Sequence, residues 1–158
     1  LLALLRAAVC QLASDYIEGL NILSSMRMCA NVPCQSAIQT ALGGYQSIDD
    51  LVKENGRLRI QRDVTTDMLN GIDGISCVKP KGAMYCFAKV DEKKFNIQND
   101  EQMVLDLLSS EKILLVHGRA FNLTEGTYFR LVFLPHSDVL VPALHRIGNF
   151  FRTYKQGA

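Results

Sequence analysis

The sequence has almost no net charge. It contains 17 lysines and arginines against 16 aspartates and glutamates, which gives a formal net charge of +1 at pH 7. This balance produces no field strong enough to attract nucleic acid or an anionic membrane surface, and no basic stripe runs along the chain. We therefore expect neither nucleic acid nor a membrane as a partner.

Long apolar runs and closely paired cysteines are missing as well. Residues 1–13, "LLALLRAAVCQLA", are too short and too interrupted for a transmembrane helix, and no small-residue cleavage site follows them. The five cysteines are odd in number and form no C-x-x-C pair, which favours reduced thiols packed in the core of a cytoplasmic protein. A redox or metal pair at Cys29 and Cys34 stays open as the alternative, although no nearby histidine supports it.

Phosphate-binding loops and nucleophilic triads are not found either. The segments "GGY" and "HGRAFN" match neither G-x-x-x-x-G-K-[ST] nor G-x-G-x-x-G, which argues against nucleotide binding. None of the three histidines, His117, His136 and His145, has a metal-ligand or nucleophile partner at a suitable spacing. No catalytic residue and no metal site are predicted within this chain.

What the sequence does contain is enough apolar residue for a core, since 48% of its 158 residues are hydrophobic. The first half shows helical periodicity. A Val-Pro break and Gly43-Gly44 separate its first helices, and a capping-box pattern follows at Ser47–Asp50. The expected helices cover about residues 12–28, 33–42, a short stretch after 47, and 57–70.

The second half alternates strand and helix patterns. A hairpin around "PKGA", with Gly82 supplying positive φ, joins strands near residues 75–77 and 84–90. A capping box at Asn99–Gln102 opens a helix, strands follow at 113–117 and 128–134, and the last helix tolerates Pro142 only in its first turn. The order predicts an α/β (α+β) two-layer sandwich: a small mixed sheet of about four strands covered by helices.

One charged residue interrupts the last strand, "YFRLVFLP". Aromatic and β-branched residues dominate this run, and the proline closes it. Arg130 is always charged and is almost never buried without a partner. The pattern leaves two alternatives open, a salt bridge to a neighbouring acidic residue or a contact with a small carboxylate ligand.

Four motifs together carry a family resemblance. They are "RMCANVPCQSAIQTALGGYQSI", "GISCVKPKGAMYCFAKVD", "ILLVHGRAFN" and "YFRLVFLP". In this order they resemble the C-terminal part of the class I (fold-type I) pyridoxal-phosphate aminotransferases, most closely the bacterial alanine transaminases. The resemblance covers the chain from about Tyr16 to its end, whereas residues 1–13 depart from the family pattern.

The resemblance implies roles for four residues. In the family, the arginine at the position of Arg130 binds the α-carboxylate of the amino-acid and 2-oxo-acid substrates. Gly82 and the "HGRAF" loop match segments that line or support the active-site entrance. Asn31 and Pro33 match a turn near the cofactor and the partner subunit of a homodimer.

The resemblance also implies what this chain does not supply. The family's Schiff-base lysine lies upstream, in an S-x-x-K segment followed by an arginine, and we expect no such segment in this chain. Residues 1–46 would then be the helical tail of the large cofactor-binding domain, and residues 47–158 the small domain. We expect pyridoxal 5'-phosphate in the full-length protein but not in this fragment, which would be inactive alone. The alternatives are a stand-alone domain that binds small carboxylates or amino acids, and a structural interaction domain.

Overall fold

A computed structural model describes residues 14–157 of the chain, which divides into two compact units, residues 1–46 and 47–158. The first unit contains helix α2 (Ser14–Met26) and helix α3 (Val32–Gly43), and neither helix has a buried residue. The predicted break between them is confirmed, because Asn31 caps α3 and accepts a hydrogen bond from the backbone N–H of Cys34 at 3.1 Å. The departure expected at residues 1–13 lies outside the described residues.

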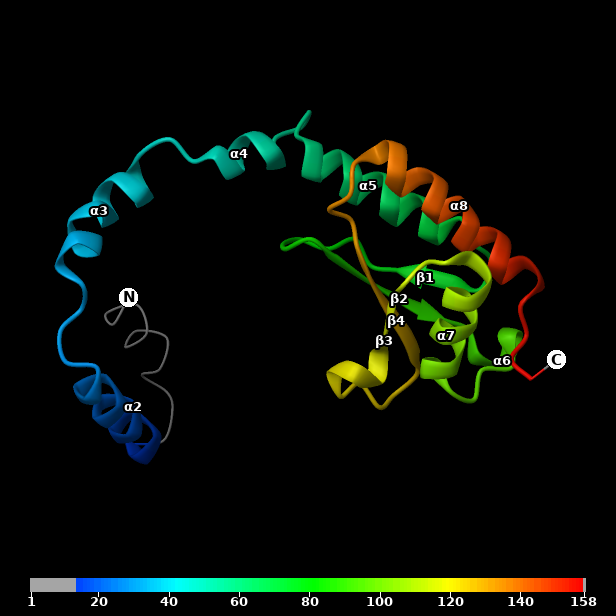
Figure 1. The fold of residues 1–158 in the computed structure, drawn as a ribbon, viewed down its shortest axis with the longest axis horizontal. Helices are drawn as coiled ribbons and strands as arrows, with labels where there is room; N and C mark the ends of the chain where they lie inside the picture. Colours follow the sequence, from blue (N-terminus) through cyan, green and yellow to red (C-terminus); the bar gives the residue numbers. More distant parts are fainter. Residues whose placement is uncertain (1–13, 158) are drawn as a thin grey trace. The chain divides into compact units, whose positions relative to one another are not determined.

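The second unit contains all of the buried hydrophobic core among the described residues. Two helices come first and are followed by a hairpin, two more helices, a second hairpin that contains a 3-10 helix, and a last helix (Figure 1). In chain order they are α4 (Ser47–Val52), α5 (Arg57–Asn70), β1 (Ile75–Cys77), β2 (Tyr85–Val90), α6 (Glu92–Phe95), α7 (Asp100–Glu111), β3 (Val116–His117), the 3-10 helix η1 (Gly118–Phe121), β4 (Thr127–Val132) and α8 (Ser137–Thr153).

The four strands form one sheet in the order β1-β2-β4-β3, which confirms the predicted two-layer class. The expectation of a mixed sheet is wrong, because every strand pair is antiparallel. Strands β2 and β3 do run in the same direction. However, β4 lies between them and pairs with both, so the crossover through α7 creates no parallel pair.

Side chains of the two central strands alternate between a covered and an open face of the sheet. Cys86, Ala88, Phe129 and Leu131 are buried, and α5, α7 and α8 form the helical layer over that face (Figure 1). Residues in between, on β2 and β4, point to the other face and are exposed or half-buried. The alternation therefore leaves one face of the sheet free of α-helices within the described part of this unit.

Two local expectations about turns are corrected. Pro142 is the sixth residue of α8, so it lies beyond the first turn. It is tolerated there because Pro142 and Asp138, whose carbonyl loses its helical partner, are both exposed to solvent. In the turn before β2, positive φ is adopted by Ala83, at 56°, and not by Gly82.

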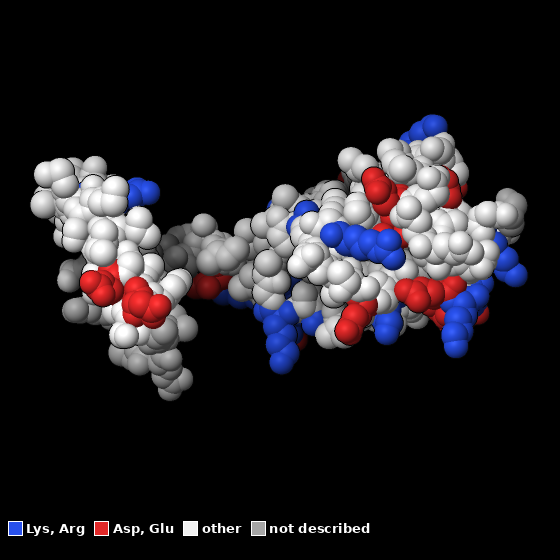
Figure 2. All heavy atoms as spheres, turned by 90° about the horizontal axis from the view of Figure 1, so that it is seen from below, with Lys and Arg blue, Asp and Glu red and all other residues white. Residues whose placement is uncertain are grey.

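Charges of both signs are interspersed over the face of the molecule that Figure 2 shows, as the near-zero net charge predicts. No helix within residues 14–157 is both long enough and apolar enough to cross a membrane.

The exposed helices of the first unit generate a test of self-association. Large apolar side chains on α2 and α3 are open to solvent, among them Leu23 at 61% and Leu42 at 76% exposure. We expect the 158-residue chain to associate at high concentration in light scattering, and a chain of residues 47–158, which keeps the core, to stay monomeric. A monomeric mass for both chains would contradict the expectation.

Candidate functional site

Arg130 lies on the open face of the sheet, in the central strand β4. Its neighbours in register are Phe87 on β2 and Val116 on β3. The residues before and after it, Phe129 and Leu131, point into the core. The two-residue period of the strand therefore presents the arginine side chain to whatever approaches the open face.

Aromatic rings hold the guanidinium in place. Its Cζ atom lies 4.6 Å from the ring centroid of Tyr85 and 4.3 Å from that of Phe121. Phe121 in turn meets Phe87 edge to face, with ring centroids 5.3 Å apart and an interplanar angle of 75°. The π faces attract the delocalised cation but satisfy none of its N–H donors.

No carboxylate of the described residues neutralises Arg130. Within residues 14–157 its guanidinium forms neither an ion pair nor a hydrogen bond, and its Nε atom is buried without a hydrogen-bond partner. A buried donor without an acceptor is costly, and because Nε is buried, an arriving carboxylate would meet the terminal Nη atoms of the guanidinium. The salt-bridge alternative therefore finds no partner in the described residues, and the arrangement fits a bidentate carboxylate ligand.

The other predicted site residues have local places in the fold. Asn31 and Pro33 belong to the first unit, where both act in starting α3. Gly82 is exposed in the β1–β2 connection and lines a shallow pocket with Pro80 and Phe133. Their family roles stay predictions.

No metal site accompanies the arginine. Within the described part of the chain, no group of three or more histidine, cysteine or acidic side chains could hold a metal ion. Cys77 and Cys86 are buried as expected, but Cys29 and Cys34 are exposed, which corrects the expectation that they pack in the core. A hydrogen bond with Cys77 and burial raise the pKa of the Cys86 thiol, so Cys86 is a poor nucleophile.

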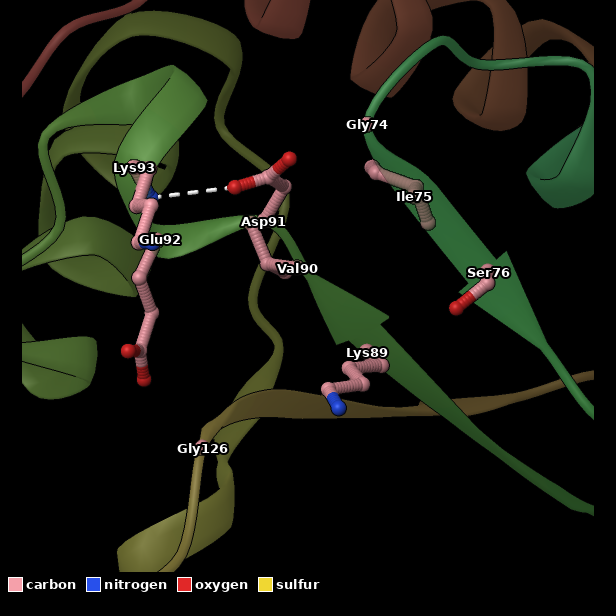
Figure 3. A pocket seen from close by; sticks show the side chains of 9 residues that line it. All are labelled: Gly74, Ile75, Ser76, Lys89, Val90, Asp91, Glu92, Lys93 and Gly126. Carbon is pink, nitrogen blue, oxygen red and sulfur yellow. Dashed lines mark hydrogen bonds between the residues drawn. The ribbon is translucent and has the colours of Figure 1, made fainter.

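A pocket that Arg130 does not line lies beside β1 and β2 (Figure 3). Two of its charged groups already have contacts. Asp91 accepts hydrogen bonds from the backbone N–H groups of Lys93 and Lys94 and so caps α6, while the Lys89 amine lies 6.0 Å from the Tyr128 ring centroid. These contacts explain the residues as structural.

Comparison with known proteins then decides the family. Residues 2–147 match the family model described as "Aminotransferase class I and II". The chain belongs to this family. The match includes most of residues 1–13, which the motifs alone had set apart.

Curated aminotransferases are among the relatives of this family member. It is 56% identical over 144 residues to the glutamate-pyruvate aminotransferase AlaA of Haemophilus influenzae and 54% identical to an alanine aminotransferase of Mycobacterium bovis. These matches cover 91% of the chain but 36% and 34% of the relatives, so the chain spans about a third of their length.

Solved structures agree with the fold. An aminotransferase from Escherichia coli matches with a TM-score of 0.78 and 52% identity, over 92% of this chain and 36% of that one. An alanine aminotransferase from Pyrococcus furiosus matches with a TM-score of 0.71 and 34% identity, over 90% and 35%.

The described residues of this aminotransferase segment do not by themselves fit pyridoxal phosphate. The pattern S-x-x-K does occur twice, at Ser76–Lys79 and Ser109–Lys112, and Arg119 follows the second match. The expectation that the chain lacks an S-x-x-K segment followed by an arginine is therefore wrong. Yet Lys79 pairs with Asp63 at 3.2 Å, and Lys112 donates to the carbonyl of Ser109 at the end of its own helix. All eight lysines are exposed, so none sits in a pocket suited to a Schiff base.

Sequence reasoning missed the two aromatic residues that hold Arg130. Tyr85 lies in a segment that was expected to form a strand, but no local pattern links it to Arg130, because aromatic residues are common in strands. Phe121 was noticed only as part of the "HGRAF" loop, and its distance from Arg130 depends on how that loop folds back.

Because Arg130 has no acidic partner among the described residues, we expect its charge to contribute little to the stability of the chain. Replacement by methionine keeps the contact with the rings and removes the unsatisfied Nε donor. We expect Arg130→Met to change the free energy of unfolding of the chain, measured by urea denaturation, by less than about 1 kcal/mol. A loss of about 3–5 kcal/mol, typical of breaking a buried ion pair, would contradict this expectation.

Proposed function

We propose that this chain is the C-terminal part of an aminotransferase that moves an amino group between an L-amino acid of the alanine or glutamate type and a 2-oxo acid. The observation that carries the proposal is Arg130, a half-buried cation held against two rings, with no acceptor for its N–H groups among the described residues. The names of the relatives support the same substrate class.

In this proposal Arg130 binds the α-carboxylate of the substrate. The planar guanidinium can donate two parallel N–H bonds to one carboxylate, and such charge-assisted pairs fix both position and orientation. Because the rings of Tyr85 and Phe121 already restrict the guanidinium, little of its freedom is lost when the carboxylate binds. The α-carbon is then held in one orientation, which favours reaction at that atom.

The division of the chain completes the proposal. Residues 1–46 are proposed as the tail of a large cofactor-binding domain, and residues 47–158 as the small domain. Pyridoxal 5'-phosphate and the Schiff-base lysine belong to a part of a homodimeric enzyme outside this chain. Asn31 and Pro33 then lie near the cofactor or the partner subunit, and Gly82 near the entrance, as the family resemblance implies.

Kinetics of the complete enzyme test the role of Arg130. Two charge-assisted hydrogen bonds are worth about 1.5–3 kcal/mol each, so Arg130→Ala should lower kcat/KM for alanine at least about 100-fold. Arg146→Ala is the matched control, since Arg146 is a half-exposed arginine of α8 that pairs with Glu111 at 3.1 Å. An equal effect of the two substitutions would remove the substrate role of Arg130.

The alternative of a stand-alone carboxylate-binding domain predicts different behaviour of the chain itself. Under the aminotransferase proposal, the 158-residue chain with added pyridoxal phosphate is inactive, and calorimetry detects no difference between wild type and Arg130→Ala on titration with glutamate or alanine at millimolar concentration. Binding by the wild type that is lost in Arg130→Ala would favour the alternative.

A further inference from the structure

Asp100 is a buried acidic residue that has no role in the proposed carboxylate-binding site at Arg130 as described so far. Its side chain is 2% exposed although it is the first residue of α7. The start of this helix is already capped, because the side chain of Asn99 accepts hydrogen bonds from the backbone N–H groups of Glu101 and Gln102. Burying the Asp100 carboxylate is therefore not needed to begin the helix.

The Asp100 carboxylate contacts the end of β3 and the first turn of η1. Its Oδ2 atom accepts a hydrogen bond from the backbone N–H of Arg119 at 3.0 Å, and Oδ1 lies 3.5 Å from Nε of the same residue. The Nδ1 atom of His117 lies 3.7 Å from Oδ2. Residues on both sides of Gly118 thus converge on one carboxylate.

The same segment is held from its other side by β4. Gly118 is buried, and a Cβ atom added there would lie 3.0 Å from Cβ of Tyr128, closer than ordinary contact allows. With Asp100 on one side and Tyr128 on the other, η1 has little room to shift. It ends at Phe121, whose ring stacks on the Arg130 guanidinium.

We propose that Asp100 is a positioning residue of the carboxylate-binding site at Arg130. It anchors the backbone of Arg119, which fixes η1 and thereby holds the ring of Phe121 against Arg130. Asp100 acts only through this chain of contacts. The inference rests on the proposed function of Arg130.

The test measures competitive inhibition of the complete enzyme by propanoate, a monocarboxylate that reports on the arginine site. We expect Asp100→Ala to raise the inhibition constant about tenfold, because a displaced guanidinium binds in poorer geometry. Asp100→Asn, which keeps an oxygen to accept the Arg119 N–H bond, should raise it less than about threefold.

Asp106→Ala is the matched control on the same helix. Asp106 accepts hydrogen bonds from Gln102 and from the Tyr154 hydroxyl, both at 2.7 Å, so its loss perturbs α7 without touching η1. The inhibition constant of Asp106→Ala should stay at the wild-type value. An equal rise in Asp100→Ala and Asp106→Ala would overturn the positioning role.

A double-mutant cycle separates this inference from the proposed function. If Asp100 acts through Arg130, Asp100→Ala has no further effect on propanoate inhibition in an Arg130→Ala enzyme, and additive effects would overturn the inference. Weaker inhibition in Arg130→Ala but not in Asp100→Ala refutes the Asp100 role alone. Unchanged inhibition in Arg130→Ala refutes both proposals.

A substitution at the far end of the chain of contacts covers the case in which Asp100→Ala does not fold. Phe121 is 41% exposed, so Phe121→Ala removes the ring with little loss of core. It should raise the propanoate inhibition constant about as much as Asp100→Ala is expected to, and an unchanged constant would refute the proposed coupling.

Discussion

The guanidinium of Arg130 on the open face of the sheet is the constraint on which the rest of the site depends. A permanent cation in a half-buried strand needs an acceptor, and residues 14–157 provide rings on both sides of it but no carboxylate. In our proposal, an anion from outside the described residues supplies that acceptor. The cation also gives the aromatic rings of Tyr85 and Phe121 a favourable contact on a face of the sheet that no described α-helix of this unit covers.

The core on the opposite face keeps this arrangement in register. Phe129 and Leu131 are buried beneath the helical layer, so β4 cannot slip by one residue without exposing them and burying the arginine. Phe129 also stacks on Phe151 of α8, with ring centroids 6.1 Å apart. Packing energy on one face therefore determines which side chains the other face presents.

Local signals predicted much of the second unit. The capping-box pattern at Asn99–Gln102 was expected to open a helix and does, and the expected last helix is α8, whose buried residues Leu140, Leu144, Ile147 and Phe151 recur at helical spacing. These features depend on residues three or four positions apart, where sequence patterns are strongest.

Long-range contacts could not be predicted in the same way. The antiparallel pairing of every strand and the stacking of Phe121 on Arg130 depend on how distant segments meet. Asp100 shows the difference most clearly. It lies inside a capping-box pattern that was recognised, yet its burial and its contact with Arg119, 19 residues away, leave no local trace.

A crystal structure of the complete enzyme with a bound substrate analogue tests the central claim most directly. The claim predicts a ligand carboxylate with its oxygens about 2.7–2.9 Å from the guanidinium nitrogens of Arg130, which would still lie between Tyr85 and Phe121. A structure in which an acidic side chain pairs with Arg130, while the ligand carboxylate binds elsewhere, would contradict it.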